Sequence, residues 1–171
     1  MRSLLAISLL ALASSSLRGQ AKTIARYGFV DGAVAIDVRP GGIIAIAGAQ
    51  GDSAATVVFR VNDARAWTDS TRRFVTRAAP KKATVVVLQR SMIEESSGSG
   101  AAVSFLRRAA SDTTTFELLF STRGFGKFSL ALERREAVLF FASMKRAVDA
   151  TKPSPAPKAI AKPKPKSKKA P

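Results

Sequence analysis

The clearest hydrophobic pattern in the chain runs from Lys127 to Asp149, where its period changes from two residues to nearly four. Phe128, Leu130 and Leu132 alternate with smaller or polar residues, as in a half-buried β-strand. Apolar residues then recur on one helical face; they are Ala137, Phe141, Met144 and Val148. A strand that leads directly into an amphipathic helix predicts a small domain in which the helix packs on its own sheet.

The preceding sequence divides into short alternating runs separated by turn signals. Four of them come first, at residues 23–30, 33–39, 43–49 and 54–61. Glycine, proline and aspartate between the runs favour tight turns, and short turns join antiparallel neighbours. We therefore expect an antiparallel meander.

A first helix follows, with Asn62 or Asp63 as its expected N-cap and Pro80 as its limit. Its predicted inner face holds Ala64, Trp67, Thr71, Phe74 and Ala78. On the opposite face Asp69 lies four residues after Arg65 and three before Arg72, so ion pairs within the helix are expected. We interpret the arginines of the domain as a solvated face.

A second set of strands is predicted at residues 83–93, 101–108, 115–122 and 127–132, before the second helix. The order is ββββα-ββββα. The predicted fold class is α+β, with a mainly antiparallel sheet of about eight strands and two amphipathic helices, in one domain spanning residues 22–150.

The second helix lacks a clean polar side, because Leu139 lies nearly opposite Phe141 on the helical wheel. Two interpretations follow. We expect the helix to lie in a groove that covers it on two sides, because a terminal helix often closes the core of a small domain. Alternatively, Leu139 and Phe140 belong to an exposed patch that meets a protein partner.

The N-terminus has the layout of a secretory signal peptide, with Arg2, an apolar run from Leu4 to Ala13, and small or polar residues after it. The run is too short to cross a bilayer, which takes about 20 residues. We expect cleavage after Ala21 rather than after Ala13, because the second choice cuts into the apolar run. The predicted location is the periplasm or cell envelope, with no transmembrane segment in the mature chain.

The charge of the chain is strongly positive, at +16. Residues 151–171 combine frequent prolines with seven lysines and no acid. This composition predicts a disordered, semi-rigid arm. Lysine is a point charge suited to diffuse attraction by an anionic surface. The predicted contacts are Lys152, Lys158, Lys162, Lys164, Lys166, Lys168 and Lys169.

Two absences limit the chemistry: the chain has no cysteine and no histidine. Disulfides, thiolate metal sites, thiol nucleophiles and serine–histidine–aspartate triads are therefore excluded. The adjacent acids Glu94 and Glu95 open a glycine- and serine-rich segment, which we interpret as a solvated loop tip. We predict no catalytic residue, no metal site and no cofactor.

The sequence thus predicts an exported, non-catalytic binding or accessory module, whose tail docks on anionic lipid, lipopolysaccharide or cell-wall polymer. Two alternatives stay open. The order of four strands and a helix, twice over, is similar to the Whirly and Pur-type single-strand-binding folds, which implies nucleic-acid binding. Closure of the eight strands into a barrel would resemble the lipocalins and imply an apolar ligand, although their Gly-x-Trp signature is absent.

Overall fold

A computed structural model describes residues 21–78, 87–96, 100–110, 113–123 and 126–151. The expected signal peptide, apart from Ala21, lies outside these residues. The seven lysines of the expected tail also lie outside them. The structure therefore concerns the domain between the two.

The first half of the domain forms a four-stranded antiparallel sheet, here called sheet A. Its strands follow chain order and are β1 (Lys22–Gly28), β2 (Ala33–Arg39), β3 (Ile43–Gln50) and β4 (Ser53–Arg60). The second half forms another, called sheet B. Its strands are β5 (Val87–Glu94), β6 (Ala102–Ala110), β7 (Thr113–Thr122) and β8 (Gly126–Leu132). The α+β order predicted from the sequence is confirmed.

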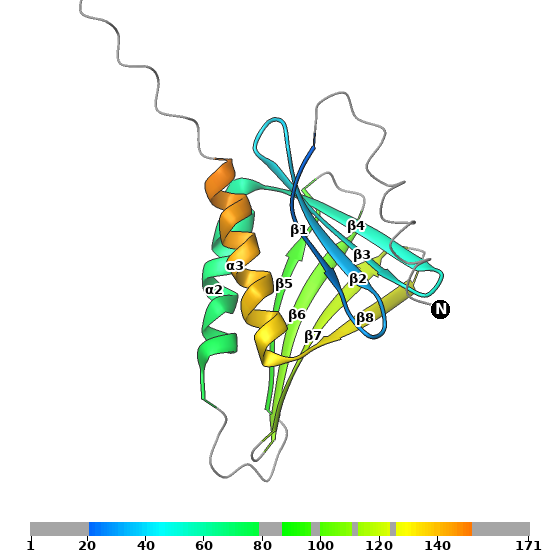
Figure 1. The fold of residues 1–171 in the computed structure, drawn as a ribbon, viewed down its shortest axis with the longest axis vertical. Coiled ribbons are helices and arrows are strands. Elements are labelled where there is room, and N and C mark those ends of the chain that lie inside the picture. Colours follow the sequence, from blue (N-terminus) through cyan, green and yellow to red (C-terminus); the bar gives the residue numbers. More distant parts are fainter. Residues whose placement is uncertain (1–20, 79–86, 97–99, 111–112, 124–125, 152–171) are drawn as a thin grey trace, which may run out of the picture.

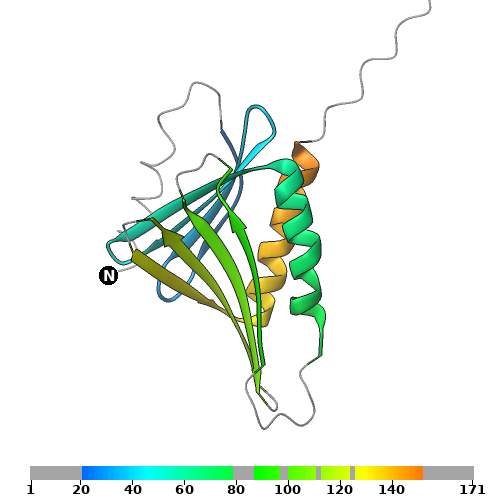
Figure 2. The same ribbon diagram turned by 180° about the vertical axis from the view of Figure 1, so that it is seen from behind.

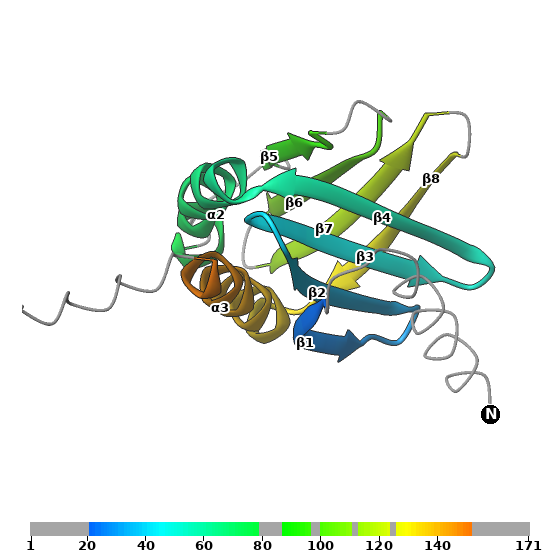
Figure 3. The ribbon, with the colours of Figure 1, turned by 90° about the horizontal axis from the view of Figure 1, so that it is seen from above.

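The eight strands do not form one sheet, and in this respect the expectation was wrong. Sheet A and sheet B are separate and cross one another (Figure 3). The reason lies in the connections, because β4 leads directly into a helix instead of turning back to pair with β5. The barrel alternative is therefore also wrong, since among the described residues no ladder joins sheet A to sheet B.

Each sheet is followed by one helix, α2 (Val61–Thr76) after sheet A and α3 (Arg134–Ala150) after sheet B. The two helices run antiparallel, side by side, along one flank of the sheets (Figures 1 and 2). α2 contacts β5 and β6, while α3 contacts β1 and β2. Each helix thus packs on both sheets and not only on the one it follows.

The N-cap that the sequence indicated for α2 was wrong, whereas α3 begins with a capping box. The N-cap of α2 is Arg60 rather than Asn62 or Asp63. Asp63 lies in the first turn, where its carboxylate is favoured by the helix dipole and accepts a hydrogen bond from the Ser96 hydroxyl at 3.3 Å. At α3 the backbone N–H of Glu133 donates to the Glu136 carboxylate at 2.7 Å, which satisfies a donor at the helix start.

The two sheets touch directly at the end away from the helices. Gly48 of β3 faces Phe120 of β7, and a Cβ atom at Gly48 would lie 2.5 Å from the Phe120 ring. The Gln50 side chain donates to the backbone oxygen of Ser129 at 2.7 Å, which joins β3 to β8. A residue without a side chain at position 48 therefore lets the sheets approach closely.

Between the crossing sheets and the helices lies a cluster of aromatic side chains. Trp67 of α2 packs against Phe140 and Phe141 of α3, with ring centroids 6.3 and 5.7 Å apart. Phe141 meets Phe105 of β6 edge to face at 4.8 Å, and Phe105 stacks on Phe116 of β7 at 5.7 Å. This cluster links both helices to sheet B, as expected for an inward Trp67.

The contact at Gly48 gives a direct test of the fold. Gly48→Ala should lower the free energy of unfolding by about 2–3 kcal/mol, because the new methyl group overlaps the Phe120 ring. Urea unfolding of the two proteins measures the change. Gly28→Ala is the matched control, since a Cβ there has no neighbour within 4 Å. Equal stabilities for the two variants would contradict the sheet contact.

Candidate functional site

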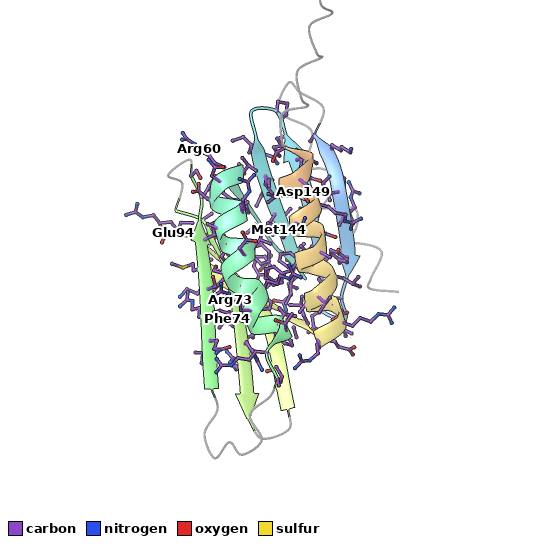
Figure 4. The ribbon with its side chains drawn as sticks, turned by 90° about the vertical axis from the view of Figure 1, so that its left-hand side faces the viewer. Arg60, Arg73, Phe74, Glu94, Met144 and Asp149 are labelled. Carbon is purple, nitrogen blue, oxygen red and sulfur yellow. The ribbon has the colours of Figure 1, made fainter. Side chains whose placement is uncertain are left out.

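The structure resolves the two interpretations of α3 by showing how the helix is turned. α3 is covered on two sides, by α2 and by β1 and β2 of sheet A (Figure 4). Its buried arc, however, includes Phe140 and Met144, which are both 0% exposed. Leu139 lies outside this arc and is 45% exposed. The groove expected around the helix exists, but the prediction that it would cover Leu139 was wrong.

The same orientation also corrects the second interpretation, in which Leu139 and Phe140 form an exposed patch. Phe140 cannot contribute to an exposed patch, because its ring is buried against Trp67. The neighbour that does reach the surface is Val138, at a level similar to that of Leu139. The Leu139 carbonyl accepts a hydrogen bond from the Tyr27 hydroxyl at 3.0 Å, and the same hydroxyl meets Ser143. This link fixes α3 to the edge strand β1.

Substitutions at the two neighbouring positions should therefore have opposite effects. Leu139→Asp should change the free energy of unfolding by about 1 kcal/mol, because nearly half of the residue is already in solvent, at 45% exposure. Phe140→Ala should lower it by about 3–5 kcal/mol through lost aromatic packing. Thermal and urea unfolding measure both. A strongly destabilised Leu139→Asp would show that the side chain is buried after all.

The loop that follows β5 connects the two halves of the domain. The Ser96 backbone N–H donates to the Val58 carbonyl of β4 at 3.0 Å, and its hydroxyl lies 3.3 Å from the backbone nitrogen of Arg60. The start of this loop is thus fixed to sheet A, while its tip, expected to be solvated, includes residues 97–99 and lies outside the described residues. Glu94 is exposed and Glu95 half-buried. Within the described residues, no group of three or more acids is placed to hold a metal ion.

A shallow depression of about 180 Å³ lies between the exposed edges of α2 and α3. Its rim has both signs of charge, from Arg65 and Asp69 on α2 and from Lys145 and Asp149 on α3. Lys145 and Asp149 form an ion pair at 2.6 Å. This balance of charges gives the depression little preference for an anion or a cation.

Ion pairing on α2 differs from the expectation. Among described residues, the ion pairs are Lys145–Asp149 on α3 and Arg108–Glu117 on sheet B, where the atoms lie 2.9 Å apart. Asp69 forms none with Arg65 or Arg72 in this part of the chain. More of the arginine charge of the domain is thus left without a carboxylate than the sequence pattern indicated.

Three arginines gather where α2 ends, from different parts of the chain. Arg107 lies on the inward face of β6, Arg134 begins α3, and Arg77 is the C-cap of α2. We call these three residues the arginine cluster. None of them forms an ion pair with a described residue.

Arg107 is the buried member, with 2% of its surface exposed. Its Nη1 donates to the carbonyl of Phe74 at 2.8 Å and its Nη2 to that of Ala78 at 3.0 Å. Arg134 donates to the neighbouring carbonyl of Val75 at 2.9 Å, and its guanidinium lies 5.7 Å from the centre of the Phe116 ring. The last carbonyls of a helix lack partners within it and carry partial negative charge, so the two guanidinium groups cap α2.

The cap compensates only part of the positive charge. Burial lowers the pKa of Arg107, and repulsion by Arg134 and Arg77 lowers it further. Because a guanidinium stays protonated at neutral pH, the charge must be stabilised in place. A helix C-terminus supplies roughly half an elementary charge to the buried guanidinium of Arg107, whereas Arg77 and Arg134 are exposed beside it.

Further polar groups face the same region from sheet B. Gln89 is the cross-strand partner of Arg107, and Thr114 lies two residues before Phe116, the partner of Arg107 on β7. Three buried polar atoms in this group have no hydrogen-bond partner; they are Arg107 Nε, Gln89 Oε1 and Thr114 Oγ1. Buried polar atoms are nearly always satisfied, so these three atoms call for a water molecule or an ion as their partner.

The sequence pattern did contain a signal for this site. In β6 the inward positions are Val103, Phe105 and Arg107, so a charged residue occupies a place where the alternation calls for an apolar one. Arg77 and Arg134 could not be placed beside it from the sequence. They lie far from it along the chain and meet it only because α2 and α3 are antiparallel.

Comparisons with known proteins add no further assignment. No known protein-family model matches the chain, and no curated protein matches it either. Among the described residues, no helix is long and apolar enough to cross a membrane.

Proposed function

We propose that this chain is an exported, non-catalytic binding or accessory module that is held at an anionic surface of the cell envelope by its C-terminal segment. The observation that carries the proposal is the composition of residues 151–171, which hold seven lysines and no acid. Each lysine near an anionic membrane contributes about 1 kcal/mol. Partial engagement of the segment is therefore enough for reversible docking.

The boundary between domain and segment supports this division of roles. The Thr151 hydroxyl donates to the Val148 carbonyl at 2.7 Å and so closes the last turn of α3. Up to that point α3 is held by buried residues such as Met144 and Val148. A lysine-rich segment that starts after this turn can engage a surface without disturbing the core.

The proposed destination follows from the N-terminus, which is built like a signal peptide cleaved after Ala21. The proposed partner is anionic lipid, lipopolysaccharide or cell-wall polymer, which share a high density of negative charge. The absence of histidine and cysteine from the sequence favours binding over catalysis. A protein partner at Val138 and Leu139 remains compatible with this role.

Co-sedimentation with liposomes tests the tail. The mature chain from Lys22 to Pro171 should pellet with vesicles containing anionic lipid at low salt and be released as salt rises, because the Debye length shrinks to about 8 Å at physiological ionic strength. A chain ending at Ala150 should stay in the supernatant. A full-length variant with the seven lysines replaced by glutamine separates charge from length. Equal pelleting of all three proteins would contradict tail docking.

Single-stranded nucleic-acid binding is the second candidate, and the observed ββββα-ββββα order favours it. Fold order alone does not define a function. Such proteins stack bases on accessible aromatic rings, and the aromatic side chains described here are buried or half-buried. For this reason the candidate ranks below surface docking.

An electrophoretic mobility shift with single-stranded oligonucleotides distinguishes the two. We expect no complex from the domain ending at Ala150, even at low salt, because few rings are available for stacking. Weak binding that appears only with the lysine segment present would reflect charge alone. A tight complex formed without that segment would favour the nucleic-acid function instead.

A further inference from the structure

We propose that the arginine cluster, together with Gln89 and Thr114, forms a binding site for a small oxyanion of the phosphate class. The site lies where α2 ends and goes beyond the surface docking assigned to the lysine segment. Its defining feature is the gathering of three guanidinium groups and two neutral polar side chains around a buried donor that has no partner, Arg107 Nε.

The buried charge of Arg107 favours an anion over a neutral water molecule as the partner of its Nε. The three arginines have no carboxylate within ion-pair distance among the described residues. Burying a cation without a compensating charge is costly. The helix carbonyls meet only part of that need.

The chemistry of the donors selects the class of anion. Arg107 keeps Nε free while its Nη atoms hold the helix carbonyls. Arg134 uses Nη1 on Val75, which leaves further N–H groups for a ligand. A hydroxyl at Thr114 adds a neutral donor, and the amide of Gln89 can turn either its oxygen or its nitrogen toward the same region. Several donors at fixed positions suit the oxygens of phosphate or sulfate.

The elements that carry the site give it a rigid frame. Gln89 and Arg107 face each other across β5 and β6, and Thr114 projects from the adjacent strand β7. Arg77 and Arg134 approach from the helix side, at the C-cap of α2 and the start of α3. Phe74, whose carbonyl accepts from Arg107, lies in the last turns of α2 (Figure 4). An anion bound here would join sheet B to both helices.

Binding of inorganic phosphate to the mature full-length chain tests the site. Isothermal titration at constant ionic strength, with chloride replaced by phosphate, should show phosphate binding and a raised melting temperature. Arg77→Gln and Thr114→Val should each weaken phosphate binding, by about tenfold for the arginine. Both residues lie away from the central core, so these variants should fold.

Arg65→Gln is the matched control, because it removes the same charge from the same helix about 18 Å from Arg77, at 1.5 Å per residue. It should bind phosphate as the natural chain does. The proposal is overturned if phosphate raises the melting temperature no more than chloride does. It is also overturned if Arg65→Gln weakens phosphate binding as much as Arg77→Gln does. The first result would mean that water satisfies the buried atoms, and the second that the attraction is diffuse.

Vesicles distinguish the source of the phosphate group. The full-length variant whose seven tail lysines are glutamine serves as the parent chain, because it removes pelleting by the tail. If Arg77→Gln in this parent loses binding of inorganic phosphate but pellets with vesicles of phosphatidic acid as the parent does, the site takes a soluble phosphate. If it loses both, the site takes a phosphate-bearing headgroup. Either result supports the site. Because tail docking is measured with the chain that ends at Ala150, failure of one proposal leaves the other testable.

Discussion

The close contact between Phe120 and Gly48 is the constraint on which the rest of the structure depends. Two twisted sheets that touch at one end and cross must separate at the other. The space that opens between them has to be filled, since an empty interior loses both hydrophobic and dispersion energy. The helices fill it with Trp67, Phe140 and Phe141. The position of both helices is therefore a consequence of how the sheets meet.

The antiparallel pairing of the helices brings charged residues together as well as aromatic ones. The C-terminus of α2 comes beside the N-terminus of α3 (Figure 1), where α2 contacts β6 and α3 contacts β7 and β8. The exposed carbonyls of α2 attract Arg107 and Arg134. Once those carbonyls are capped, the remaining positive charge and the unpartnered Arg107 Nε make the same place suitable for an oxyanion. Structural capping and the proposed ligand binding thus share one cluster.

The domain and its lysine segment use positive charge in different ways. Arginine predominates in the domain, where planar guanidinium groups can satisfy carbonyls and an anion in fixed geometry. Lysine is the only charged residue in the segment after Thr151, and it suits a surface whose charges are not ordered. If the lysine segment docks on a surface that carries phosphate groups, the arginine cluster of the domain would be held where its proposed ligand is concentrated.

The sequence by itself determined the element order, most strand positions and the inward residues Ala64, Trp67 and Thr71 of α2, because periods of two and 3.6 residues record which side of each element is buried. Ala78, also expected on that face, lies exposed beyond the end of the helix. Turn residues such as Gly41 and Gly42, both with positive φ, marked where strands reverse. Local patterns carry no information on how separate elements face one another. Only the tertiary structure decided that the eight strands form two sheets, that α3 turns Phe140 inward and Leu139 outward, and that Arg77 and Arg134 join Arg107. Each of these depends on contacts between residues far apart in the chain, whose relative placement is set by packing around the aromatic cluster.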